Sequence, residues 1–235
     1  MKTTPPLADH YAMLREEAEM ERPEAAFVLY KILESCKFAY EERRDLEVAL
    51  HDLKSTHKLR APEMDQPVLL RKEESIRNWE TMLRTSHEAC GGISREQKGE
   101  RNKWLEISAS AGYPIAMREY SATIDEYEAG VSLDITRWHN GDAQALRSLA
   151  MRYWKNYDDG NKPTDKISAY AAMFAYKRIA LENAARTGHE HDRRLERIQS
   201  ELDSIGGRLR EFEIEIALAE AEELVKSNQN CCFSF

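Results

Sequence analysis

The sequence predicts an all-α fold, and three of its properties support that prediction. Apolar residues recur at the 3.6-residue helical period along almost all of the 235-residue chain. The good helix formers Ala, Glu, Leu, Arg and Lys dominate the composition. With 10 Gly and 7 Pro, the chain is too poor in turn formers for a many-stranded sheet protein. An apolar content of 42% also argues against disorder.

Four amphipathic segments are expected before the glycine pair Gly91 and Gly92. They span about 7–22, 23–36, 41–57 and 67–89. Pro23 suits the first turn of the second segment, because proline there removes no helical hydrogen bond. The glycine pair suits the C-terminus of the fourth segment. Between the third and fourth segments, prolines near both ends of 60–67 predict a loop.

Further helices are expected after the glycine pair. They lie near 94–111, 114–128, 132–140, 142–157 and 164–186. Ser94 and Gln97 have the spacing of a capping box, which predicts a helix start. The polar run 158–163 is a dense turn signal. Three glycines suit the ends of helices in this region, namely Gly112, Gly141 and Gly188.

The last stretch has a heptad-like pattern. Its apolar residues alternate three and four apart, at Leu195, Ile198, Leu202, Ile205, Leu209, Phe212, Ile216 and Ala219. Gly206 and Gly207 interrupt the pattern, and each costs about 1 kcal/mol relative to Ala in a helix. Two helices with a bend between them are therefore expected. This pair is predicted to cap the preceding helices, with a self-associating coiled coil as the alternative.

A short pattern repeats where helices meet. In two copies a glycine is followed by an alanine four residues later and then by a tyrosine: Gly112, Ala116 and Tyr120, and Gly141, Ala145 and Tyr153. In a degenerate third copy Glu21 replaces the glycine and Ala25 follows. Glycine supplies the left-handed backbone that ends one helix, and a small alanine lets the next helix approach its neighbour closely. One such hairpin cannot bury both faces, so several are expected to stack.

These junctions resemble the Sel-one-like repeats, relatives of the tetratricopeptide repeats. In that family a helix ending Ala-Ala-x-x-Gly is followed by x-x-x-Ala and Leu-Gly-x-x-Tyr; here Ala150 stands where the second Gly is usual, and the spacing between junctions varies. The resemblance implies a right-handed α-α superhelix (solenoid) of antiparallel helix pairs over 5–190, clearest over 104–188. A C-terminal capping helical hairpin over 191–227 and a flexible tail over 228–235 would complete the chain.

Two of the four cysteines lie on apolar helix stripes. Cys36 follows Leu29 and Leu33, and Cys90 follows Ile76, Trp79 and Leu83. From the residues alone, the pair can be two buried thiols or a disulfide between helices. The resemblance favours the disulfide, because similar bacterial proteins combine two such cysteines with a signal peptide. It also implies a periplasmic or secreted protein, with a cytoplasmic location as the alternative.

The charge pattern bears on the kind of partner. The formal net charge is −8, and basic residues occur only as scattered pairs. Nucleic-acid binding is not expected, because no basic stripe is available to neutralise a phosphate backbone. No membrane span is expected either, since no apolar run approaches the required length of about 20 residues.

No common catalytic signature is present in the sequence. The nucleophile elbow, the phosphate-binding loop, the dinucleotide fingerprint and the His-Glu-x-x-His motif are all missing. The best metal candidate, His189-Glu190-His191, has no nearby third ligand and is interpreted as solvated. The chain is therefore predicted not to be an enzyme, and no cofactor or metal is expected.

The expected function is that of a protein–protein interaction adaptor with a peptide or protein bound on the concave face of the repeat array. Aromatic residues concentrate between Trp104 and Tyr176, and Tyr, Trp and Arg commonly anchor partners. The residues predicted to bind the partner are Arg152, Trp154 and Tyr157. Two alternatives remain: an enzyme or small-ligand binder with a site hidden in the helical scaffold, and a homo-oligomer assembled through the C-terminal heptads. The sequence does not identify the partner.

Overall fold

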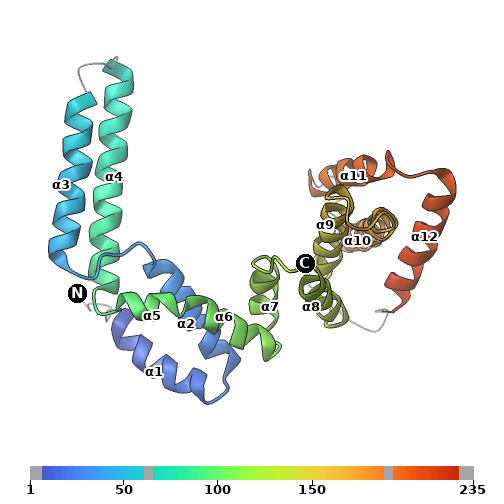
Figure 1. The fold of residues 1–235 in the computed structure, drawn as a ribbon, viewed down its shortest axis with the longest axis horizontal. Coiled ribbons are helices and arrows are strands. Elements are labelled where there is room, and N and C mark those ends of the chain that lie inside the picture. The colour runs from blue at the N-terminus through green and yellow to red at the C-terminus, as the bar shows by residue number, and fades with distance from the viewer. Residues whose placement is uncertain (1–6, 61–65, 188–192, 228–235) are drawn as a thin grey trace. The chain divides into compact units, whose positions relative to one another are not determined.

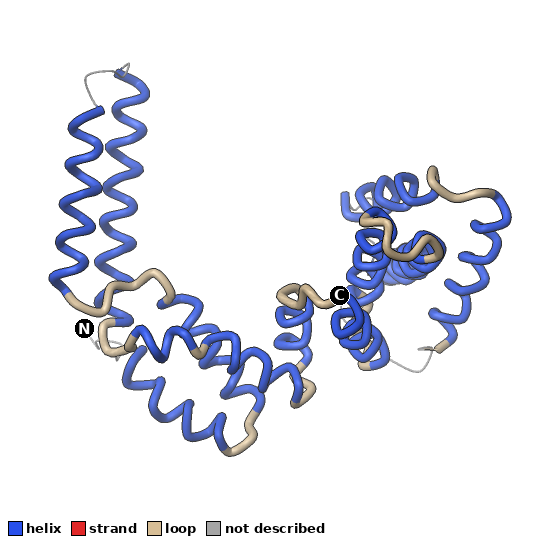
Figure 2. The backbone as a smooth tube through the Cα atoms, in the orientation of Figure 1, coloured by secondary structure: helices blue, strands red, loops and turns tan. Residues whose placement is uncertain are grey.

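The protein is all-α, as predicted. The structure, a computed structural model, describes residues 7–60, 66–187 and 193–227. Within these ranges it contains twelve helices and no strand (Figures 1 and 2). The chain divides after Ala116 into two compact units, the N-terminal unit (1–116) and the C-terminal unit (117–235). None of the described helices combines the length and the apolar character needed to cross a bilayer.

The N-terminal unit is organised around a central helix, α2. Its helices are α1 (Leu7–Glu19), α2 (Pro23–Cys36), α3 (Arg43–Arg60), α4 (Gln66–Cys90), α5 (Arg95–Gly99) and α6 (Arg101–Ser110). α2 packs against α1 and α6, and it buries Leu29, Leu33 and Cys36 at helical spacing. α6 contributes the buried Trp104 and Leu105. The short helix α5 begins with the predicted capping box formed by Ser94 and Gln97.

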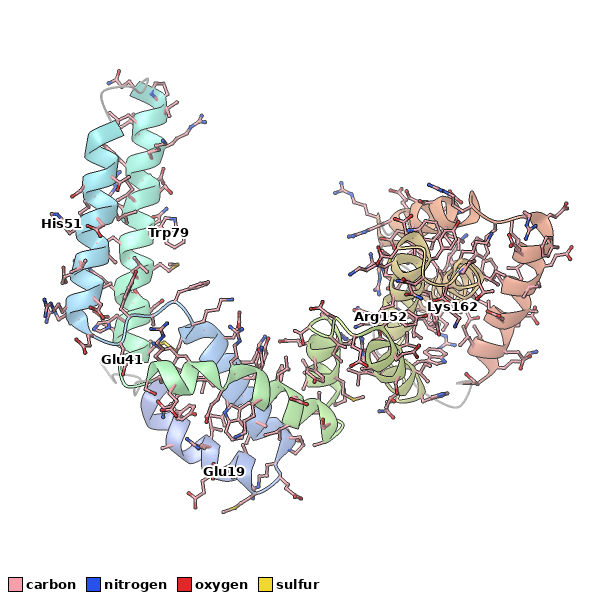
Figure 3. The ribbon with its side chains drawn as sticks, in the orientation of Figure 1. Glu19, Glu41, His51, Trp79, Arg152 and Lys162 are labelled. Atoms are coloured by element: carbon pink, nitrogen blue, oxygen red, sulfur yellow. A yellow bond between two sulfur atoms is a disulfide. The ribbon has the colours of Figure 1, made fainter. Side chains whose placement is uncertain are left out.

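Helices α3 and α4 form a long antiparallel hairpin (Figure 1), and the buried residues among those whose burial is described lie near its base. Leu46 and Leu50 are buried there. Trp79, predicted on the apolar stripe of α4, is 54% exposed and extends from the side of α4 away from α3 (Figure 3). The position that faces α3 between Ile76 and Leu83 is taken by Glu80, whose carboxylate lies 2.8 Å from the Nζ of Lys54.

Four helix ends share one hydrogen-bond pattern. Each has a residue with left-handed φ: Glu21 (60°), Gly112 (85°), Gly141 (86°) and Gly160 (78°). At Gly112 the N–H donates to the Ala109 carbonyl (2.9 Å), and the next N–H, of Tyr113, donates to the Ser108 carbonyl (3.1 Å). This pair of bonds is the Schellman motif, and the other three ends have the equivalent pair. Glu21, which replaces glycine in the degenerate copy, therefore adopts the glycine conformation.

The C-terminal unit is built around α10 (Figure 1). Helix α7 (Pro114–Ser121) spans the division between the units, and the rest are α8 (Tyr127–His139), α9 (Gln144–Asp158), α10 (Asp165–Thr187), α11 (Arg193–Gly206) and α12 (Glu211–Lys226). α10 packs against α9, α11 and α12. Its alanines allow this close approach, because Ala169, Ala172 and Ala175 are all buried. α8 begins at Tyr127, five residues before the predicted start.

The glycine pair separates the last two helices, as expected, but the heptad pattern changes phase across it. α11 buries Ile198, Leu202 and Ile205 as predicted. In α12 the expected residues Phe212 and Ile216 are 51% and 46% exposed. The face that packs on α10 is instead marked by four buried residues four apart: Glu213, Ala217, Ala221 and Val225. The turn at 207–210 rotates α12, so the heptads do not form one continuous seam.

Some predicted features lie outside the described residues. They are most of the loop at 60–67, the helix end at Gly188, the pair His189 and His191, and the tail 228–235.

Candidate functional site

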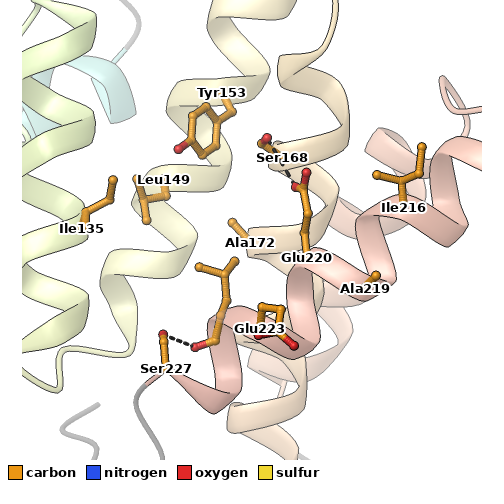
Figure 4. A pocket seen from close by; sticks show the side chains of 11 residues that line it. Ile135, Leu149, Tyr153, Ser168, Ala172, Ile216, Ala219, Glu220, Glu223 and Ser227 are labelled. Atoms are coloured by element: carbon orange, nitrogen blue, oxygen red, sulfur yellow. Dashed lines mark hydrogen bonds between the residues drawn. The ribbon is translucent and has the colours of Figure 1, made fainter.

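An apolar groove in the C-terminal unit is the candidate site. It has a volume of about 760 Å³ and lies among helices α8, α9, α10 and α12 (Figure 4). Its lining residues are Ile135, Leu149, Tyr153, Ser168, Ala172, Ile216, Ala219, Glu220, Glu223, Leu224 and Ser227. A groove of this size, apolar and with a few polar groups, is typical of sites that take a small molecule or an anchoring side chain. We call it the α12 groove.

The rotation of α12 about its own axis creates the groove. Glu213, 4% exposed, faces α10, where its carboxylate lies 2.9 Å from the Nζ of Lys166. Its other oxygen accepts from the guanidinium of Arg210 at 3.0 Å. The Lys166 pair acts together with the burial of Ala217, Ala221 and Val225 to hold this face of α12 against α10, and the remaining side chains therefore point elsewhere. Ile216 and Ala219 are left lining the groove, with no helix packed over them among the described residues.

The floor of the groove comes from small and aliphatic residues of α9 and α10. Leu149 and Ala172 are nearly completely buried, so they form a fixed surface. Tyr153 stands above Leu149 on α9 (Figure 4). Burial, followed by the negative charges of Asp165 and Glu220, raises the pKa of the Tyr153 phenol. At neutral pH this phenol is therefore a neutral hydrogen-bonding group, and the wall it forms carries no charge.

The edge of the groove is acidic. Glu220 and Glu223 line it from α12, and both residues are exposed. The Ser168 hydroxyl donates to Glu220 at 3.5 Å (Figure 4). No lysine or arginine lines the groove in the part of the chain that the structure describes. The groove thus offers apolar surface bordered by negative charge.

Arg152, one of the three predicted partner-binding residues, points into the fold. Its Nε donates to Asp134 at 2.9 Å, and its Nη1 donates to the Ile124 carbonyl at 3.0 Å. Its Nη2 donates to the Ser121 carbonyl. A Cβ at Gly130 would lie 2.3 Å from Nη1, so this glycine in α8 leaves room for the guanidinium. The guanidinium of Arg152 is committed to internal hydrogen bonds.

Arg152 belongs to a chain of alternating charges. Asp134 also accepts from Arg137 (2.6 Å), whose Nη2 donates to Asp142 at 2.7 Å. Arg118 completes the series, with its Nη2 3.0 Å from Asp142. The carboxylate of Asp134 is fully buried and Arg137 nearly so. A buried series of paired charges joins α7, α8 and α9 and is costly to break at any member.

Trp154 and Tyr157, the other two predicted binding residues, are half-buried neighbours on α9. Their ring centroids lie 5.4 Å apart, and the Nζ of Lys166 lies 5.9 Å from the Tyr157 centroid. Trp154 packs against the core of the C-terminal unit, and neither residue lines the α12 groove. The structure therefore separates these aromatic residues from the candidate site.

Cys36 and Cys90 form a disulfide in the structure. The bond closes a separation of 54 residues and joins the C-terminus of α2 to that of α4. Both residues are buried. The pairing is the one that the family resemblance implied.

A second, polar pocket lies beside the base of the α3–α4 hairpin. It has a volume of about 530 Å³, and the charged residues lining it include Glu47, Arg84 and Glu88. Arg84 pairs there with Glu47 at 2.9 Å and with Glu80 at 3.2 Å. Because Arg84 is already paired with two carboxylates, it is less available to an external anion. No three His, Cys, Asp or Glu side chains come together as a metal site in the described residues.

Ile216 and Ala219 are the groove residues that sequence reasoning missed, because the heptad pattern assigned them to a buried seam. The sequence does hold a signal for their true position. Ala217, Ala221 and Val225 follow Glu213 at intervals of four, and small residues at that spacing favour close helix packing.

Comparisons with protein-family models, with curated proteins and with solved structures find no match to this chain.

Proposed function

We propose that this protein is a non-catalytic adaptor that docks a segment of a partner protein in the α12 groove. The observation that carries the proposal is the exposed apolar surface of Ile216 and Ala219 beside a floor formed by Leu149 and Ala172. Exposed apolar side chains that are grouped in a concave site of this size are typical of binding surfaces. Apolar residues that are exposed singly need no such explanation.

We further propose that the helix pairs are divergent Sel-one-like repeats stacked as a right-handed superhelix. The four Schellman junctions support this, because the same local geometry recurs at Glu21, Gly112 and Gly141, where the repeat pattern was identified. The buried alanines that follow, Ala116 and Ala145, support it as well. On this proposal the groove belongs to the end of the array, where α11 and α12 form the cap.

A periplasmic or secreted location is part of the proposal. The buried Cys36–Cys90 disulfide supports it, because such bonds form and persist in oxidising compartments.

Selection of peptides tests the docking function. The whole protein is used to select from a displayed library of random 16-residue peptides, and recovered peptides are synthesised and titrated. The diagnostic variant is Ala219→Trp, which fills the groove from an exposed position. The matched control is Ala185→Trp, an exposed alanine of the same unit that does not line the groove.

We expect Ala219→Trp to weaken peptide binding at least ten-fold and Ala185→Trp to leave it unchanged. Failure to recover any peptide, or equal binding to both variants, would overturn the proposal. An apolar dye that binds wild type but not Ala219→Trp, without any recovered peptide, would identify the groove as a small-ligand site instead.

A further inference from the structure

Two carboxylates border the α12 groove on the same side. Glu220 and Glu223 are three residues apart on α12, so they project from one face of the helix. Ile216 and Ala219 occupy the adjoining positions of that face. An occupant lying along α12 would therefore contact apolar surface and carboxylates together.

These carboxylates are poorly compensated within the protein. Among the described residues Glu220 forms no ion pair, and its polar contact is the Ser168 hydroxyl at 3.5 Å. Glu223 pairs with Lys226, on the same helix, at 3.0 Å. By contrast, the carboxylate of Glu213, near the start of α12, contacts two cations, Lys166 and Arg210. Negative charge at the groove is thus left for an external cation.

The charge of the helix as a whole has the same sign. α12 carries six glutamates and one lysine, and the chain has a formal net charge of −8. A second copy of this chain would bring α12 against an equally acidic surface, and nucleic acid would be repelled. A basic partner is favoured on both counts.

We propose that the partner segment is a basic amphipathic helix, with apolar residues that enter the α12 groove and lysine or arginine residues that pair with Glu220 and Glu223. This inference rests on the proposed docking function. A helix-in-groove complex of this kind places its anchors at intervals of three and four residues. Basic residues beside those anchors then meet the carboxylates at the edge of the groove.

The test compares peptides selected by three forms of the whole protein. They are wild type, the double variant Glu220→Gln/Glu223→Gln, and the control Glu215→Gln/Glu222→Gln. The control removes the same charge from exposed positions of α12 that do not line the groove. Thermal unfolding establishes that both variants keep their fold.

Wild type and the control are expected to select peptides with apolar residues three and four apart and with adjacent Lys or Arg. The Glu220→Gln/Glu223→Gln variant is expected to lose the preference for Lys and Arg. It should bind a recovered basic peptide about five-fold more weakly at low salt, with the difference shrinking as salt is added.

Recovery of neutral or acidic peptides that still fail to bind Ala219→Trp would overturn the charge inference and leave the docking function standing. Recovery of no peptide would overturn both. A groove closed by self-association, detected as a dimer in sedimentation that Ala219→Trp dissociates, would overturn the inference. A further contradicting result would come from a variant that lacks residues 228–235. If peptides bind only to that variant, and without a preference for charge, residues 228–235 compete for the groove.

Discussion

The two units stabilise their helices in different ways. In the N-terminal unit the described buried residues of the α3–α4 hairpin lie near its base, where the Cys36–Cys90 disulfide joins α4 to α2. In the C-terminal unit the alanine-rich α10 packs against three helices, and a buried series of charges links α7, α8 and α9. Both units have a packed helical core, to which the N-terminal unit adds a covalent bond and the C-terminal unit adds paired buried charge.

The difference explains where a groove can form. Close packing of small residues on one face of α12 leaves its larger apolar residues on another, so the C-terminal unit has both a rigid core and an unfilled apolar surface. The α3–α4 hairpin also has exposed apolar residues, but the pocket beside its base is lined mainly by charged residues. Removing the disulfide should therefore lower the stability of the N-terminal unit, and breaking the buried charge pairs should lower that of the C-terminal unit.

The largest effect is expected from Asp134→Ala in the buried charge series. Removing this carboxylate takes away the ion-pair partner of Arg152 and one of the two partners of Arg137, and breaking such a buried pair costs about 3–5 kcal/mol. Urea unfolding of the C-terminal unit, followed through Trp138 and Trp154 fluorescence, measures the loss. Asp125→Ala, at an exposed position, should change stability by less than about 0.5 kcal/mol. Similar losses from both variants would show that the series is not structural.

The second effect is expected from Cys36→Ala/Cys90→Ala. The disulfide constrains a long loop of the unfolded chain, and its loss should lower the stability of the N-terminal unit by about 2–4 kcal/mol. Residue-resolved hydrogen exchange should show faster opening of α2 and α4 with α9 and α10 unchanged. A thiol reductant should reproduce the result in wild type and have no effect in the variant. Equal destabilisation of both units would contradict this division.

Smaller effects of opposite sign are expected at the Schellman junctions. Gly112→Ala should lose about 1 kcal/mol through its left-handed backbone alone, because an added Cβ would meet nothing within 4 Å. Glu21→Gly should gain up to about 1 kcal/mol for the same reason. Thermal unfolding of the two variants measures both signs. A loss on Glu21→Gly would show that the left-handed conformation is not strained there.

The smallest effect is a pH dependence centred on Glu213. Hydrogen bonds from Arg210 and Lys166 lower the pKa of this carboxyl to about 2. Because its pKa is depressed in the folded state, its contribution to stability is present above the ordinary pKa near 4.5 and is lost as pH falls towards 2. The difference in Tm between wild type and Glu213→Gln should thus be greatest near pH 6 and vanish near pH 2. A difference that does not change with pH would contradict the ion pairs.

Local signals in the sequence were sufficient for most helices and for several of their ends, although α7 ends at Ser121 instead of near 128 and α8 begins at Tyr127 instead of 132. The left-handed glycines, the capping box at Ser94 and the break at Gly206 are set by backbone preferences that act within a few residues. The rotation of α12 was not predictable in this way. It depends on contacts of Glu213 with Lys166, which lies 47 residues away in the sequence.

Arg152 illustrates the same limit. A basic residue beside aromatic ones has the composition of a binding surface, and the sequence offers no reason to turn it inward. Its hydrogen bonds to Asp134 and to the carbonyls of Ser121 and Ile124 arise from tertiary structure. The orientation of a long, flexible charged side chain depends on such contacts more than on the local sequence pattern. It is therefore hard to predict from the sequence.

Backbone NMR of the whole protein, titrated with a selected peptide, tests the docking claim most directly. We predict chemical-shift changes concentrated at residues lining the α12 groove, above all Leu149, Ala172, Ile216 and Ala219, and their absence in Ala219→Trp. Changes concentrated instead on the α3–α4 hairpin, or persisting unaltered in Ala219→Trp, would contradict the assignment of the groove as the binding site.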